Sequence, residues 1–226
     1  MAAEKGGVLR TPAELLLELS FPQRCVLCHR FLGGEEHILC PDCVKNLPPA
    51  EKDLKRGEFF KRCVSVCSYE GRVREAIHRF KFKACSFYAE PFGRLMAQVL
   101  SRELAGQFDL VTYVPVGPLR FRLRGYDQAR LLAEVVGREL EVPMLRTLTK
   151  IRNNAPQSSL LTAAARRANV QNVYRAVNRG QWAGKRLLLI DDVVTTGATL
   201  SEASRVLLSH GAKRVFCGTF AATPKP

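Results

Sequence analysis

The stretch of sequence that decides the fold is Arg186-Leu-Leu-Leu-Ile-Asp-Asp-Val-Val-Thr-Thr-Gly-Ala-Thr199. Residues 186–190 form a short apolar run, which is typical of a central parallel strand buried on both faces. Apolar residues follow at helical spacing over residues 200–210, and Gly211 supplies a stop signal. Residues 215–221 predict the next strand. The segment is therefore a strand, loop, helix and strand unit, which indicates an α/β fold with a parallel sheet.

The loop at the end of this strand has the chemistry of a phosphate site. A right-handed crossover places it at the carboxyl edge of the sheet, where open α/β folds bind ligands. Residues 195–199 offer backbone N–H groups and three hydroxyls at a helix N-terminus, and Gly197 allows close approach. Asp191 and Asp192 would repel phosphate alone. They suit a ligand that also donates hydroxyls, as ribose does, or that brings a divalent cation.

The amino-terminal part carries a paired cysteine motif. Two residues separate Cys25 from Cys28, and eleven residues later Cys40 and Cys43 repeat that spacing. Two such knuckles supply four thiolate ligands for tetrahedral zinc. So short a segment rarely folds without a metal or a disulfide, and four thiolates leave no open coordination position. We therefore expect a structural zinc ion.

These motifs predict two domains, a zinc domain over residues 1–55 and an α/β domain over residues 56–226. Residues 11–14 have the form of a helix start. Gly33 and Gly34 are expected at the tip of a hairpin between the two knuckles.

Positive charge is concentrated in the second domain. Residues 1–55 carry 7 Lys/Arg against 8 Asp/Glu, whereas residues 56–226 carry 28 against 13. This excess suits the phosphate groups of a nucleotide-like ligand or of nucleic acid, with a solubilising surface as the alternative. The sequence shows no secretion signal and no apolar run of membrane-spanning length. We expect a cytoplasmic protein without membrane insertion, whose eight cysteines favour metal binding or buried thiols over disulfides.

Two basic stretches each have more than one interpretation. Residues 72–83 interleave cations with apolar and aromatic residues, which favours an amphipathic helix with its aromatic residues in the core and its basic face in water. A track for single-stranded DNA is the alternative. A predicted helix over residues 127–140 follows three arginines, which face pyrophosphate, a nucleic-acid backbone or solvent. Residues 149–171 predict a mobile loop. The three arginines are Arg120, Arg122 and Arg124.

Residues 188–200 resemble the phosphoribosyl pyrophosphate motif of the type I phosphoribosyltransferases. With the four-cysteine motif in front, nearly the whole chain is similar to the ComF family, also called GntX-like, which is associated with natural competence for DNA uptake. The resemblance is least distinctive over residues 44–107. Its further matches are Phe21-Pro22, Val114-Pro-Val-Gly-Pro-Leu119, Arg124-Gly-Tyr-Asp-Gln128, residues 157–160 and residues 166–170.

The resemblance implies a mainly parallel, doubly wound sheet of the type I phosphoribosyltransferase kind, preceded by a small zinc domain. It implies that Asp191 and Asp192 bind the ribose hydroxyls of phosphoribosyl pyrophosphate, which comes with magnesium. The residues it assigns to the 5′-phosphate are Thr195, Thr196, Gly197 and Thr199. The turn after a strand at residues 110–114 takes the pyrophosphate, and the candidate contacts are Val116, Gly117 and Arg124.

Three positions depart from related sequences. Asp127 stands where the family usually has Asn, and Lys150 stands where Arg is common. Thr195 occupies a position at which the hypoxanthine-guanine branch of the superfamily has an aspartate that assists proton transfer at the purine. The resemblance therefore does not imply that branch's chemistry.

Two functions follow from this resemblance. The first is a competence protein that binds phosphoribosyl pyrophosphate, takes part in DNA uptake, contacts single-stranded DNA and works with other competence proteins. The second is a metabolic phosphoribosyltransferase, in which an acceptor displaces pyrophosphate from the ribose. Both use the same phosphate loop, and the sequence assigns neither a catalytic residue nor an acceptor base.

Overall fold

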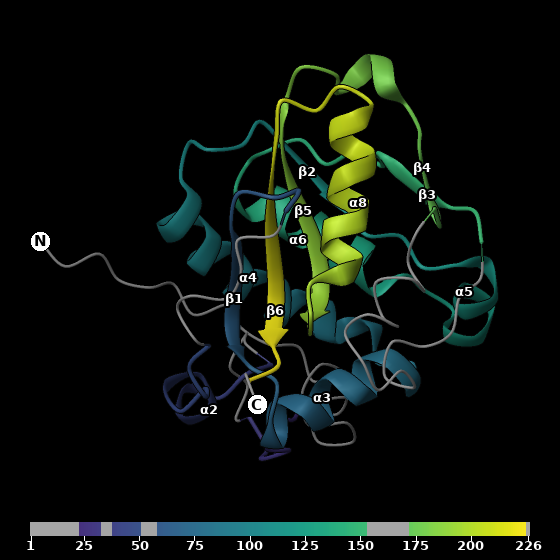
Figure 1. Ribbon diagram of the computed structural model, residues 1–226. Coiled ribbons are helices and arrows are strands. Elements are labelled where there is room, and N and C mark those ends of the chain that lie inside the picture. Colours follow the sequence, from purple (N-terminus) through teal and green to yellow (C-terminus); the bar gives the residue numbers. More distant parts are fainter. Residues whose placement is uncertain (1–22, 33–37, 51–57, 153–171, 225–226) are drawn as a thin grey trace, which may run out of the picture. The chain divides into compact units, whose positions relative to one another are not determined.

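Four parallel strands form the central sheet in the order β1-β6-β5-β2 (Figure 1). Strand β5 has β6 and β2 as its neighbours, and its residues Leu187, Leu188, Leu189 and Ile190 are fully buried. Such a strand has both faces covered, as its unbroken apolar run predicts. The strands are β1 (Cys63–Ser68), β2 (Leu110–Tyr113), β5 (Arg186–Val194) and β6 (Arg214–Ala222).

The computed structural model describes residues 23–32, 38–50, 58–152 and 172–224, and the chain divides into two units between Asn46 and Leu47. The first unit contains the cysteine motif and the short helix α2 (Pro41–Lys45). The second contains the sheet and its helices. The predicted division after residue 55, the predicted helix start at residues 11–14 and the hairpin tip at Gly33 and Gly34 lie outside the described residues.

Helices cover both faces of the sheet. Helices α4 (Ala89–Leu104) and α6 (Gln128–Glu139) pack together on one face, and α8 (Ala198–Ser209) packs on the other (Figure 1). An antiparallel pair, β3 (Leu148–Lys150) and β4 (Tyr174–Ala176), lies beside α8. This three-layer arrangement confirms the predicted doubly wound α/β fold with a mainly parallel sheet. The remaining elements of this unit are α3 (Gly71–Phe82), η1 (Ser86–Tyr88), α5 (Pro118–Arg124) and η3 (Arg179–Gln181).

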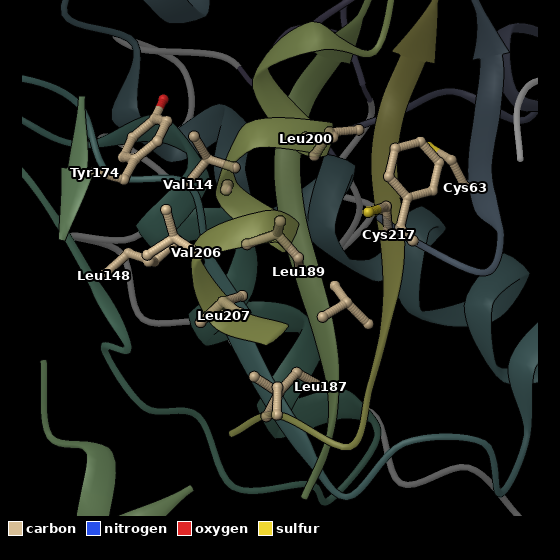
Figure 2. Close-up of a cluster of buried hydrophobic side chains, with 14 of the residues drawn as sticks. Cys63, Val114, Leu148, Tyr174, Leu187, Leu189, Leu200, Val206, Leu207 and Cys217 are labelled. Atoms are coloured by element: carbon tan, nitrogen blue, oxygen red, sulfur yellow. The ribbon is translucent and has the colours of Figure 1, made fainter. Parts of the chain in front are cut away.

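The core between the sheet and α8 joins strands to helix through interdigitating aliphatic side chains. Figure 2 shows Leu187 and Leu189 of β5 facing Val206 and Leu207 of α8. Trp182 is fully buried in the same cluster, and its Nε1 donates a hydrogen bond to the carbonyl of Val177 over 2.7 Å. A buried indole with its one polar atom paired stabilises this layer through its large apolar area.

Aromatic rings fill the core on the opposite face of the sheet. Phe92 of α4 stacks on Phe220 of β6 with ring centroids 4.0 Å apart, and Phe80 of α3 meets Phe92 edge to face at 5.8 Å. Gly93 lets α4 approach α6 closely, because a Cβ atom there would lie 2.5 Å from Cβ of Val135. The spacing between these two helices therefore depends on the missing side chain.

Most predicted elements agree with the structure, and two differ. Strand β5 continues past residue 190 through both aspartates, because its pairing with β6 extends to Val194 opposite Ala222. The three arginines before α6 lie in the short helix α5, which the sequence analysis did not predict. Residues 153–171 of the predicted mobile loop lie outside the described residues, and β3 holds Thr149 and Lys150 of its start. No helix in the described part of the chain is both long and apolar enough to cross a membrane.

We expect Gly93→Ala to lower the free energy of unfolding by about 1 to 2 kcal/mol. Overpacking against Val135 costs about 1–3 kcal/mol, which exceeds the helix-propensity gain of about 1 kcal/mol. Urea denaturation measures the change. Gly180→Ala is the matched control, because no atom lies within 4 Å of its added Cβ. The loss of unfolding free energy caused by Gly93→Ala should be smaller in a protein that also carries Val135→Ala. A Gly93→Ala protein as stable as the parent would contradict this packing.

Candidate functional site

The two aspartates lie at the carboxyl end of β5, at the edge of a large cavity. The cavity has a volume of about 1200 Å³. Its walls include every residue from Asp191 to Leu200, together with parts of α3, α5 and β3–β4. The structure therefore brings all six residues of the predicted ribose and phosphate site to one cavity. They are Asp191, Asp192, Thr195, Thr196, Gly197 and Thr199.

The phosphate loop turns from strand to helix through Gly197. This residue is the N-cap of α8 and has a φ of 76°, in the left-handed region that glycine adopts without a steric penalty. The Thr196 hydroxyl accepts a hydrogen bond from the Ala198 N–H at 3.4 Å. The first N–H groups of a helix have no intrahelical partner, and the helix dipole favours an anion beside them. Here that helix end lines the cavity.

The acidic pair is compensated by a lysine from α3. Lys81 Nζ lies 2.8 Å from Oδ1 of Asp192, and both side chains are largely shielded from solvent, with exposures of 21% and 12%. The α3 helix is amphipathic as predicted, since Val73, Ile77 and Phe80 are buried. Its basic side chains, however, do not all face bulk water. Lys81 is turned into the cavity because α3 crosses the carboxyl end of the sheet (Figure 1).

Asp191 differs electrostatically from its neighbour. Burial and the adjacent Asp192 carboxylate raise the pKa of Asp191 above its usual value, while the Lys81 ammonium acts in the opposite direction. The Asp191 carboxylate also accepts a hydrogen bond from the Asp192 N–H over 2.9 Å. Two adjacent carboxylates in a shielded site do not both ionise easily. The pair therefore favours ligands that bring hydroxyl donors or positive charge.

Asp127 fixes the turn after β2. Its two carboxylate oxygens accept hydrogen bonds from the Val116 N–H at 3.0 Å and from the Arg130 N–H at 3.2 Å. Burial raises the pKa of Asp127, and these N–H donors oppose the shift. Asp127 therefore caps α6 and ties the predicted pyrophosphate turn to that helix. Val116 and Arg124 line the cavity, whereas Gly117 is the N-cap of α5.

The wall formed by β3 and β4 carries two functional candidates to which the sequence assigned no role. Lys150 and Tyr174 line the cavity, with the Lys150 ammonium 5.7 Å from the centroid of the Tyr174 ring. Burial and nearby Arg120 lower the pKa of Lys150 to about 8, while Asp191 opposes the shift. Burial raises the pKa of the Tyr174 hydroxyl. The two strands come from segments separated by residues 151–173, so no local motif marks them.

Among the described residues, cations outnumber carboxylates around the cavity. Its acidic residues are Glu75, Asp191 and Asp192. Its basic residues are Arg74, Arg79, Lys81, Arg120, Arg124 and Lys150. A concave site lined mainly by one sign of charge concentrates ligands of the opposite sign. The cavity therefore suits an anion that also carries hydroxyl groups for the aspartates.

The four cysteines of the first unit form a compact cluster. Their sulfur atoms all lie within 4.8 Å of one another, and Cys28 Sγ is 3.7 Å from Cys40 Sγ. Zinc–sulfur bonds of about 2.3 Å in a tetrahedron place sulfurs about 3.8 Å apart, so the cluster fits zinc. Although burial opposes it, the Arg30 guanidinium lowers the pKa of Cys40 to about 6. The cysteine set is Cys25, Cys28, Cys40 and Cys43, as predicted.

Known families match both parts of the chain. Residues 127–226 match the phosphoribosyl transferase domain family, and residues 16–54 match the double zinc ribbon domain family. The fold and the two sites thus define an α/β domain of the type I phosphoribosyltransferase kind that follows a zinc ribbon. The chain is 32% identical over 210 residues to DNA utilization protein YhgH of Salmonella typhimurium, covering 88% of this chain and 90% of the relative. This chain belongs to the ComF family, as the sequence predicted.

Two further similarities extend this comparison. Competence protein ComFC of Bacillus subtilis is 28% identical over 187 residues, covering 83% of this chain and 72% of the relative. The solved structure of glutamine phosphoribosylpyrophosphate amidotransferase from B. subtilis, complexed with ADP and GMP, is 25% identical. That match covers 59% of this chain but only 26% of the amidotransferase chain, with a TM-score of 0.41.

We expect about one zinc ion per chain in freshly purified protein, and Cys40→Ser should reduce that content to a small fraction. Three thiolates form a weaker and open site, since structural zinc is almost always four-coordinate. Metal analysis by mass spectrometry gives the zinc-to-protein ratio. Cys85→Ser is the matched control, because Cys85 lies outside the cluster. Zinc content unchanged by Cys40→Ser would contradict the ligand assignment.

Proposed function

We propose that this protein binds phosphoribosyl pyrophosphate with magnesium in its cavity, contacts single-stranded DNA with its basic surface, and takes part in DNA uptake or use. The observation that carries this proposal is the joining of an acidic pair, a phosphate loop and six cations in one cavity. The names of the relatives, a DNA utilization protein and a competence protein, support the role in DNA handling. Other competence proteins would be its partners in the cytoplasm.

The ligand follows from the order of groups along the cavity. Asp191 and Asp192 accept hydrogen bonds from the two ribose hydroxyls, and residues 195–199 bind the 5′-phosphate at the start of α8. The turn at Val116 and the side chain of Arg124 face the pyrophosphate from the end of β2. An anion with adjacent hydroxyls matches each of these groups. A simple phosphate would leave the two carboxylates without hydroxyl donors.

Magnesium fits this site as a companion of the ligand. Mg²⁺ prefers oxygen ligands, keeps several waters and binds through one or two carboxylates plus substrate phosphates. The carboxylates of Asp191 and Asp192, which line the cavity beside the phosphate loop, would be its protein ligands. When bound it would neutralise pyrophosphate charge. Because Lys81 already pairs with Asp192, the protein itself compensates this carboxylate before the ligand arrives.

The DNA contact is proposed for the surface around α5. No residue of this helix is buried, and it carries Arg120, Arg122 and Arg124. Arg120 and Arg124 also line the cavity, so a strand bound along α5 would pass the ligand site. Phosphate contacts from arginine supply affinity without sequence preference.

A metabolic phosphoribosyltransferase is the second candidate, and the β3–β4 wall favours it. Lys150 has a pKa lowered to about 8, which suits a group that exchanges a proton near neutral pH. In this reaction an acceptor attacks the anomeric carbon, and the bond to pyrophosphate breaks. Pyrophosphate release by purified protein with phosphoribosyl pyrophosphate, magnesium and a panel of acceptor bases tests it. Release that depends on one acceptor would support the transferase, and no release with any would leave the binding function alone.

We expect Asp191→Asn and Asp192→Asn each to weaken the binding of phosphoribosyl pyrophosphate about tenfold to a hundredfold. The reason is that hydrogen bonds to a charged group contribute about 1.5–3 kcal/mol each. Isothermal titration calorimetry with magnesium present measures the affinity. Asp109→Asn is the matched control, because Asp109 pairs with Arg186 at the other end of β5. Equal affinity of the parent and both site variants would refute the assigned roles.

We expect the affinity for single-stranded DNA to fall steeply with salt, by about 0.7 log units per log unit of salt for each neutralised phosphate. Replacing Arg120, Arg122 and Arg124 with Ala removes three phosphate contacts. The slope should then flatten by about 2 log units of affinity per log unit of salt. Fluorescence anisotropy across a salt series measures both values. The control removes three exposed cations at the amino ends of β5 and β6, namely Lys185, Lys213 and Arg214. No binding at low salt would contradict the DNA contact.

A further inference from the structure

Helix α3 has two different faces, one in the core and one in the cavity. The cavity face runs at helical spacing from Arg74 through His78 to Phe82, four residues apart. The core face is fully or almost fully buried and consists of Val73, Ala76, Ile77 and Phe80. The core therefore fixes which side chains α3 turns toward the ligand site.

Phe82 lines the cavity, and its aromatic ring is exposed to solvent. Its side chain is 57% exposed, although it belongs to a helix whose other aromatic residue, Phe80, is fully buried. The Arg124 guanidinium carbon lies 4.9 Å from the centre of the Phe82 ring, and the His78 ring centroid lies 4.9 Å from it at a tilt of 47°. Aromatic, cationic and imidazole groups together are the components that stack against planar bases in single-strand binding proteins.

Hydrogen bonds hold this group in place. The carbonyl of Phe80, near the end of α3, accepts hydrogen bonds from the Tyr126 hydroxyl and from Nε2 of Gln128, the latter at 3.4 Å. Oε1 of the same Gln128 accepts a hydrogen bond from Nη1 of Arg124 at 2.9 Å. Gln128 is itself almost fully buried at 1% exposure. One buried amide therefore fixes both the end of α3 that carries Phe82 and the guanidinium beside its ring.

The cavity has room for a second chemical group beside a phosphoribosyl moiety. Its volume of about 1200 Å³ exceeds the roughly 300–1,000 Å³ of ordinary small-molecule pockets. The phosphate loop and the ring of Phe82 both line it. A flexible chain that places a phosphate on the loop can therefore present a base to the ring.

We propose that Phe82, flanked by Arg124 and His78, is a stacking platform for a nucleobase. This inference rests on the proposed function and deepens it, because it names the planar group that the same cavity accepts in addition to phosphates and hydroxyls. The base comes from a single strand of DNA or from a free mononucleotide, which share this chemistry. Stacking uses the face of the base, so the platform accepts different bases with little discrimination.

The test compares Phe82→Ala with the parent protein on two probes of equal length and charge. One is a short oligothymidylate and the other is the same strand with abasic residues. Phe82→Ala should weaken binding of the oligothymidylate about tenfold and leave the abasic strand unaffected, because stacking on one aromatic side chain is lost. Phe82→Trp should keep the parent affinity. Fluorescence anisotropy at low salt measures all of these affinities.

Phe87→Ala is the matched control. Phe87 is 54% exposed, similar to Phe82, but it does not line the cavity. Its removal should leave both affinities unchanged, which separates a specific platform from a general loss of exposed aromatic surface. Equal affinity of Phe82→Ala and the parent for oligothymidylate would overturn the inference. An equal loss on the abasic strand would overturn it too, because that strand has no base to stack.

Thymidine monophosphate distinguishes the two sources of the base and separates this inference from the proposed function. A loss of its affinity in Phe82→Ala identifies a free nucleotide as a ligand of the platform, and a loss confined to the strand identifies DNA. If the parent binds no strand, the proposed DNA contact fails. The mononucleotide alone then tests the platform. Weaker binding of thymidine monophosphate by Phe82→Ala than by the parent would support the inference. Equal binding by the two proteins, or no binding by the parent, would overturn it.

Discussion

Two adjacent carboxylates at the end of a fully covered strand are the constraint on which the rest of this site depends. Strand β5 is buried along Leu187–Ile190, so its next residues emerge from an apolar core rather than from water. Carboxylates in such a position are costly unless they are paired or hydrogen-bonded. The fold meets this requirement through α3, which brings Lys81 to Asp192, and through Asp191, whose raised pKa disfavours a second charge.

This requirement explains why distant segments converge on one cavity. Helix α3 precedes the acidic pair by more than a hundred residues, yet its buried face anchors it across the carboxyl end of the sheet. Asp127 holds the turn after β2 against α6, and Gln128 joins α6 to the end of α3. The start of α6 is therefore a junction between the turn, the guanidinium of Arg124 and the cavity face of α3. A change there would reach the predicted pyrophosphate turn and the cavity face of α3 together.

The parts of the molecule that depend on neighbouring residues could be predicted from the sequence. Residues 186–199 predicted the strand, loop and helix, because an apolar run and a glycine-containing turn act over neighbouring residues. The cysteine spacing predicted the zinc cluster for the same reason. Lys81 could not be assigned to Asp192, since its partner lies on another element and a basic helix usually faces water. Lys150 and Tyr174 belong to a strand pair formed across a long separation, so neither strand had a recognisable signal.

The charges that line the cavity determine which ligands it favours. Before binding, Lys81 satisfies Asp192, and the other cations of the cavity attract an anion from solution. A ligand with phosphate alone gains from these cations but meets the carboxylates unfavourably, whereas one with ribose hydroxyls gains from both. In the proposed function the same arrangement serves DNA, because arginines of α5 would contact its phosphates and an exposed aromatic ring would contact its bases. Phe82 lies beside the Arg124 guanidinium on the cavity face of α3, so under this proposal α3 would link the recognition of sugar phosphates to that of bases.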